Sequence, residues 1–148
     1  MSSPADAIVR GARDESALWA RSLAEGAPFE PVFSPLAPEE FAEGLETVYE
    51  AYLVHYGKPR LFATTDRDES VLLGDYLYAH GLVRIAEVGG VAAVAVMAEL
   101  ISRCAALRAD VAAGDGDAWV AAARALGGSP EEDAVSLALA AHSARVAP

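Results

Sequence analysis

Alanine and other apolar residues dominate this chain, in stretches that glycine and proline interrupt. Apolar residues make up 53% of the sequence, whereas runs that alternate apolar and polar residues, as half-buried strands do, are scarce. Alanine loses least conformational freedom on entering a helix, so this composition favours helices over strands. A chain of 148 residues is long enough to bury about 68–70% of its unfolded surface in one domain. We therefore expect a single all-α domain spanning residues 1–148.

The glycine and proline positions divide the chain into about six predicted helices. Residues 27–38 carry four prolines and should form an extended connector between the first two helices, because proline disfavours helix at the residue before it. Ser129, Pro130 and Glu132 have the pattern of a capping box with proline at the first helical position. The predicted helices span residues 4–25, 38–56, 68–88, 91–113, 115–126 and 130–146.

The net charge and the single cysteine limit which partners and which cellular compartment we expect for this protein. The formal net charge is −11, and an acidic surface repels nucleic acid and anionic membranes. Cys104 is the only cysteine, which excludes an internal disulfide and favours a reducing compartment. Nucleic acid is therefore not an expected partner.

No segment has the pattern of a targeting or membrane-spanning sequence. Residues 1–10 contain Asp6 and lack the long apolar core of a signal peptide. The longest apolar run, residues 88–98, is shorter than the roughly 20 residues needed to cross a membrane. We expect this run to be a buried helix, with no membrane insertion, and the protein to be cytoplasmic.

Four glutamates of the second predicted helix fall on one side of a helical wheel, drawn at about 100° per residue. Because magnesium prefers carboxylate oxygens and residues four apart can share one ion, Glu46 and Glu50 are weak candidates for metal ligands. Carboxylates opposite the packed side would point out of any interior cavity, so a solvated face is the favoured interpretation. The two opposing stripes are Glu39, Glu43, Glu46 and Glu50 on one side, and Phe41, Leu45, Val48 and Tyr52 on the other.

Gly57-Lys58-Pro59 is followed fifteen residues later by Leu72-Leu73-Gly74-Asp75-Tyr76-Leu77. This pairing resembles the trans-polyprenyl diphosphate synthases, in which an RRGxP segment leads at the same distance into a helix that opens with (L/A)xGDxL. The likeness covers about residues 44–89. It implies an isoprenoid-synthase-like fold, of which this shorter chain would hold a partial bundle.

The family's catalytic groups are replaced where the resemblance would place them. Its DDxxD magnesium motif falls on residues 46–50, which read Glu-Thr-Val-Tyr-Glu. His55 and Tyr56 stand where the family has the arginines that help to hold a diphosphate, and Lys58 and Arg60 are weak substrate-binding candidates that could compensate by charge. The resemblance thus implies no catalytic residues and no cofactor.

Asp75 falls on a predicted apolar helix face, together with Val71 and Leu82. A buried charge needs partners, and the loop at residues 57–67 could supply a cation or backbone amides. We interpret Asp75 as a structural latch, beside a glycine, Gly74, that would let a neighbouring helix approach closely.

The resemblance favours a non-catalytic auxiliary subunit of a heterodimeric prenyl diphosphate synthase, which helps a catalytic partner in isoprenoid chain elongation. Two alternatives stay open. One is a self-contained homodimeric helical protein with a structural or small-ligand-binding role, and the other is a reduced magnesium-dependent enzyme that uses Glu46 and Glu50. In the favoured hypothesis, the expected partner interface contains Tyr76, Leu77, Tyr78 and Met97.

Overall fold

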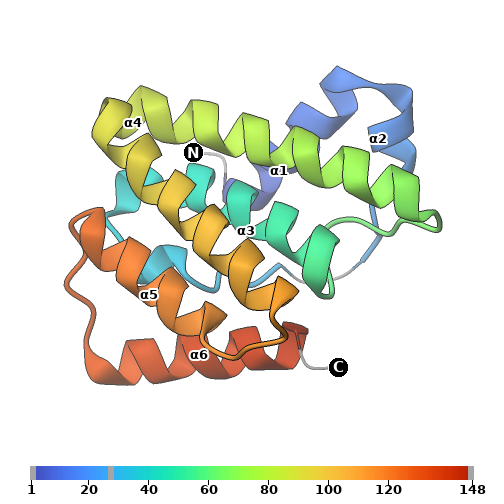
Figure 1. Cartoon of the computed structure of the whole chain (residues 1–148). Helices are drawn as coiled ribbons and strands as arrows, with labels where there is room; N and C mark the ends of the chain where they lie inside the picture. The colour runs from blue at the N-terminus through green and yellow to red at the C-terminus, as the bar shows by residue number, and fades with distance from the viewer. Residues whose placement is uncertain (1–2, 27–28, 147–148) are drawn as a thin grey trace.

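The computed structural model describes residues 3–26 and 29–146, and it confirms the all-α prediction (Figure 1). Within these residues it contains six α-helices, two short 3-10 helices and one isolated bridge between Leu23 and Phe62. In chain order, the elements are α1 (Pro4–Glu15), α2 (Ala17–Arg21), η1 (Ser34–Leu36), η2 (Glu39–Phe41), α3 (Ala42–Tyr56), α4 (Arg67–Ala109), α5 (Asp115–Ala125) and α6 (Glu132–Val146).

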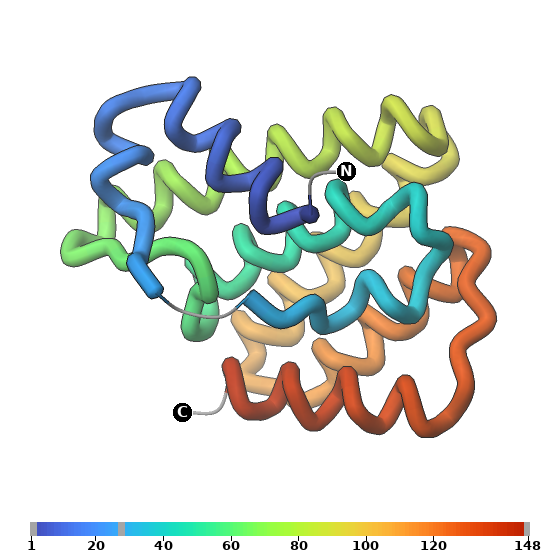
Figure 2. The backbone as a smooth tube through the Cα atoms, turned by 180° about the vertical axis from the view of Figure 1, so that it is seen from behind, coloured from blue at the N-terminus to red at the C-terminus, as the bar shows by residue number. Residues whose placement is uncertain are grey.

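Helix α3 is the central element of the bundle. It packs against α1, α4, α6 and both 3-10 helices, and the two opposite views show it enclosed between them (Figures 1 and 2). All residues from Gly44 to Leu53 are buried. A helix enclosed on every side has no solvated stripe, so the predicted solvent-facing side of α3 is wrong for Glu46 and Glu50.

The predicted break at Gly89-Gly90 is present as a sharp corner within α4. Gly90 has φ 66° and ψ −157°, a backbone conformation that residues with a side chain rarely adopt. The first half of α4 crosses the top of the molecule, and the second half returns across α3 (Figure 1). The corner therefore makes two packed rods from one long element.

Glycines let α3 and α4 approach each other closely. A Cβ at Gly44 would lie 2.7 Å from Cδ1 of Ile85, and a Cβ at Gly81 would lie 2.5 Å from Cγ2 of Val48. A Cβ at Gly74 would overlap the ring of His55. The glycine of the Gly-Asp motif thus lies at a helix contact.

The first and the last predicted helices have other boundaries in the structure. The first predicted helix is interrupted at Ser16, whose backbone is extended and whose Oγ accepts a hydrogen bond from the Trp19 N–H at 3.1 Å. A serine that caps a new helix also ends the preceding one. The last helix begins at Glu132, so Pro130 precedes it and does not occupy its first turn.

The connector packs into the main core through its aromatic residues. Phe33 is 1% exposed. Its ring stacks on Trp119 of α5 at a centroid distance of 5.4 Å and meets Tyr49 of α3 edge-on at 5.2 Å. A smaller core lies between α1, α2 and the first half of α4, and includes Ile8 and Leu73.

Candidate docking surface and buried polar networks

Arg60 forms two ion pairs in the interior of the protein. Its Nη1 lies 2.6 Å from Oε1 of Glu46 and its Nε lies 2.9 Å from Oε1 of Glu50, and all three side chains are fully enclosed. Its guanidinium also donates to the carbonyl oxygens of Glu30 and Glu46. The ring of Phe29 lies 4.2 Å from the guanidinium carbon.

Backbone amides satisfy the remaining carboxylate oxygens of this Arg60 node. Oε2 of Glu46 accepts from the N–H groups of Val32 and Ser34. Oε2 of Glu50 accepts from the N–H groups of Arg60 and Leu61 at 2.9 and 2.7 Å. Each buried charge therefore has the hydrogen bonds that make its burial tolerable.

The Arg60 node changes the interpretation of its three members. Arg60, a weak substrate-binding candidate in the sequence, is 2% exposed and joins α3 to the connector and to the loop before α4. The carboxylates of Glu46 and Glu50, the weak metal candidates, are bound to this arginine and to backbone amides. An incoming magnesium ion would have to displace these partners.

A second polar network centres on Asp115, the first residue of α5. Its Oδ2 accepts hydrogen bonds from the hydroxyl of Tyr52 at 2.6 Å, from Nη2 of Arg108 at 2.7 Å and from Nε2 of His142 at 3.0 Å. Nδ1 of His142 is 2.7 Å from the hydroxyl of Tyr49. In a neutral imidazole whose Nε2–H donates to the carboxylate, Nδ1 accepts from Tyr49.

These contacts fix the ionisation of the Asp115 network. Burial alone raises the pKa of Asp115, but the hydrogen bonds from His142 and Tyr52 and the positive charge of Arg108 outweigh it and hold that pKa well below its usual range. Burial, together with the hydrogen bond to Asp115, raises the pKa of Tyr52 far above its ordinary value. The network therefore holds a carboxylate and neutral tyrosines, with Arg108 oriented at its edge.

The prediction that Asp75 is a buried structural latch is wrong. Its side chain is 69% exposed, and Nε2 of His55 lies 3.6 Å from its Oδ1. Val71, on the same face, is also 44% exposed. The face is open to solvent, so the carboxylate is not a buried latch held by the loop. Lys58 is exposed, at the end of α3.

The residues expected at a partner interface are largely used inside the monomer. Leu77 and Met97 are 2% and 0% exposed, and they belong to the core. Tyr76 and Tyr78 are half-buried, with the Tyr76 ring 5.9 Å from Trp19 and the Tyr78 ring 5.3 Å from His55. A partner cannot reach Leu77 or Met97 without unpacking the bundle, so their assignment to an interface is wrong.

The outward face of α4 carries the exposed apolar side chains instead. By length and composition alone this helix could cross a membrane, a property that core helices share, but only 22% of its most apolar stretch is buried. Residues 88–98 are therefore mostly exposed, and their prediction as a buried helix is wrong. We use the name α4 face for four exposed apolar residues of this helix, Leu72, Val83 and Val88 before the Gly90 corner and Val91 after it, which are 58%, 56%, 45% and 88% exposed.

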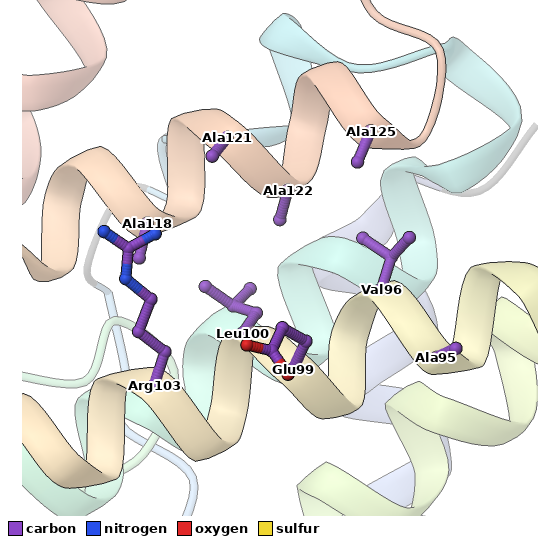
Figure 3. A pocket seen from close by; sticks show the side chains of 9 residues that line it. All are labelled: Ala95, Val96, Glu99, Leu100, Arg103, Ala118, Ala121, Ala122 and Ala125. Carbon is purple, nitrogen blue, oxygen red and sulfur yellow. The ribbon is translucent and has the colours of Figure 1, made fainter.

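A groove lies between the second half of α4 and α5 (Figure 3). Its volume is about 400 Å³. Small side chains form most of its walls, and Glu99 and Arg103 reach into it from α4 (Figure 3). The lining residues are Ala95, Val96, Glu99, Leu100, Arg103, Ala118, Ala121, Ala122 and Ala125.

Comparison of the chain with models of protein families, with curated proteins and with solved structures gives no match.

Proposed function

We propose that this protein is a non-catalytic helical subunit that binds a catalytic prenyl diphosphate synthase through the α4 face. The observation that carries the proposal is the exposure of large apolar side chains along one helix, with Val91 88% exposed at the corner of α4. Several large apolar side chains exposed on one helix favour an interaction site, because covering them removes apolar area from water.

The groove between α4 and α5 suits a helix of the partner. Helices pack at interaxial distances of about 8–10 Å, and small side chains at the contact favour the shorter end of this range. Alanines from both α4 and α5 line the groove (Figure 3). Glu99 and Arg103 would allow a charged residue on the partner helix to find an opposite charge at the rim.

The resemblance of Gly57-Lys58-Pro59 and residues 72–77 to the synthases supports this choice of partner. At the positions that correspond to the family's metal ligands, Glu46 and Glu50 form the Arg60 node. Such a node stabilises the bundle but offers no open coordination position for an ion. The chemistry of chain elongation would therefore belong to the partner.

Size-exclusion chromatography with light scattering tests the proposal on mixtures with purified catalytic polyprenyl diphosphate synthases. We expect a complex with the wild-type chain that Val91→Glu and Val83→Glu abolish, because each places a charge in an apolar contact. Leu137→Glu is the matched control, since Leu137 is 72% exposed on α6 and lies outside the α4 face. Equal loss of complex in all three variants, or no complex with the wild type, would contradict the proposal.

The second candidate function is a homodimeric helical protein, which the placement of Glu99 and Arg103 favours. These residues lie one turn apart on α4 and face the same groove. Antiparallel pairing of two copies about a two-fold axis would bring Glu99 of each copy opposite Arg103 of the other. Light scattering on Glu99→Arg, on Arg103→Glu and on the double exchange tests this candidate. If the dimer is lost in each single variant and restored in the double variant, the homodimer is established.

A further inference from the structure

The C-terminal ends of α3, α4 and α6 lie near one another (Figure 1). Residues at or next to these ends line a second concave site. This terminal pocket has a volume of about 620 Å³. It lies apart from the α4 face, and the docking proposal does not involve it. The described residues that line it are Tyr56, Gly57, Lys58, Arg108, Val111, Ala112, Ala113, Arg145 and Val146.

The charge of the terminal pocket is opposite to that of the whole protein. Lys58, Arg108 and Arg145 all line it, out of eleven lysines and arginines in a chain of net charge −11. Among the described lining residues there is no aspartate or glutamate. Cations gathered in a concavity raise the local potential and attract anions.

Arg108 is held in place before any ligand arrives. Its Nε donates to the hydroxyl of Tyr52 at 2.9 Å and its Nη2 donates to Asp115 at 2.7 Å. Its guanidinium carbon lies 5.6 Å from the ring centroid of Tyr52 and 5.7 Å from that of Tyr56. Nη1 makes no hydrogen bond within the described part of the chain, which leaves one nitrogen of an oriented guanidinium for a ligand.

The same cations also complement the partial negative charge at helix C-termini. The Lys58 N–H donates to the carbonyl oxygen of Arg145 at 2.9 Å, and this bond joins the end of α3 to α6. Helix capping alone, however, requires neither a concavity nor the clamp that Tyr52 and Asp115 place on Arg108. The pocket therefore supports more than a capping role.

We propose that the terminal pocket binds a small anion that carries two or more negative charges. Its charged oxygens would contact Lys58, Arg108 and Arg145. The carbon skeleton of an organic anion such as citrate would lie against Val111 and Val146. One cation alone binds an oxyanion weakly in water, but several cations in one concavity favour a multiply charged ligand.

Isothermal titration calorimetry at low ionic strength tests this proposal, with inorganic diphosphate and citrate as probes. We expect at least one probe to bind the wild type, and Lys58→Gln with Arg145→Gln to weaken that binding by about tenfold or more, since hydrogen bonds to charged groups contribute about 1.5–3 kcal/mol each. Arg21→Gln with Arg124→Gln removes the same charge from exposed positions on α2 and α5 and should leave the affinity within about twofold, because distant exposed charges are screened.

Tyr52→Phe supplies an independent arm, because it changes the positioning of Arg108 without changing the net charge. We expect several-fold weaker binding of the same probe, with circular dichroism showing a folded protein. No binding of either probe to the wild type at millimolar concentration would overturn the proposal. An equal loss of probe affinity in the control pair would also overturn it. If Lys58→Gln with Arg145→Gln lowers stability but leaves probe affinity unchanged, the cations cap the helices and do not bind the anion.

Discussion

At the scale of single residues, Arg60 supplies the positive charge where three segments of the chain meet. Its two carboxylate partners are on α3, its backbone is in the loop before α4, and a carbonyl of the connector accepts from its side chain. Removing one member of a buried ion network leaves an uncompensated charge, which costs more than the network itself contributes.

Arg60→Ala should therefore lower the free energy of unfolding by about 3–5 kcal/mol. Two carboxylates would remain buried without their cation. Urea denaturation followed by circular dichroism measures this change. Lys58→Ala is the control, because the exposed Lys58 should have an effect within about 0.5 kcal/mol. A decrease in the free energy of unfolding below about 1 kcal/mol for Arg60→Ala would mean that Arg60, Glu46 and Glu50 do not form the buried network described above.

Val111 adopts a backbone conformation that its side chain disfavours. Its φ is 54°, at the end of α4, where its N–H donates to the Arg108 carbonyl oxygen and the Ala112 N–H donates to that of Leu107. This is the pairing of a Schellman motif, in which glycine usually takes this position. The left-handed conformation costs a residue with a side chain about 1–2 kcal/mol.

Val111→Gly should raise the free energy of unfolding by about 0.5–1 kcal/mol. The relief of the left-handed strain exceeds the extra conformational freedom that glycine gains in the unfolded chain. The Val111 side chain is 94% exposed, so little packing is lost. A rise in Tm of a few degrees in scanning calorimetry would confirm the expectation, and a fall in Tm would contradict it.

His55 should make stability depend on pH. Burial lowers its pKa, and the charge of Asp75 opposes this only in part. The unfolded chain therefore binds more protons than the folded one just below the ordinary pKa of about 6.5. The stabilisation is complete above that pH and is lost as the pH falls through the window between the ordinary pKa and the lowered one.

Asp75→Asn should steepen this loss, because it removes the charge that favours protonated His55. Denaturation series between pH 5 and pH 8 on the wild type, Asp75→Asn and His55→Phe measure the effect. We expect the steepest acid-side decline in Asp75→Asn and the shallowest in His55→Phe. An identical pH dependence in all three would show that His55 does not titrate as described.

At the scale of elements, the glycine contacts between α3 and α4 set how closely these helices pack. The contact at Gly81 includes both the side chain of Val48 and its backbone nitrogen, which would lie 3.0 Å from an added Cβ. Backbone atoms inside a central helix cannot move aside freely. The usual advantage of alanine over glycine in a helix is then outweighed by overlap.

Gly81→Ala should destabilise the protein by about 1–3 kcal/mol. Gly11→Ala on α1 is the matched control, because its Cβ would meet only the Tyr76 hydroxyl at 3.6 Å, an ordinary contact. The control should therefore be stabilised by about 0.5–1 kcal/mol. Paired chemical denaturation measures both, and a shift of the same sign in the two variants would argue against a tight α3–α4 contact.

The helices were easier to predict from the sequence than their environments. Glycine and proline act locally, so the Gly89-Gly90 corner and the connector could be located from the chain alone. Glu46 and Glu50 could not be placed, because a stripe of acids has the same helical spacing whether water or a buried Arg60 neutralises it. The helical-wheel interpretation treated this helix as a surface helix with one solvated side. Only the packing of the other elements shows that α3 is central. For the same reason Leu77 and Met97 could not be told from interface residues.

At the scale of the whole molecule, three features coexist on an acidic protein. The Arg60 node is buried against α3. Apolar side chains are exposed on the α4 face, and basic side chains line the terminal pocket. The first feature connects α3 to the connector and to the loop before α4. The second is where we propose that a partner binds, and the third is where we propose that a small anion binds.

Site-specific photo-crosslinking tests the central claim, that the α4 face is the surface a catalytic synthase covers. A photoreactive residue replaces Val91 in one sample and Leu137 in the other, each mixed with the purified synthase and irradiated. The account predicts crosslinks to the synthase from position 91 and none above background from position 137. Crosslinks from position 137 alone, or crosslinks from position 91 only to a second copy of this chain, would contradict it.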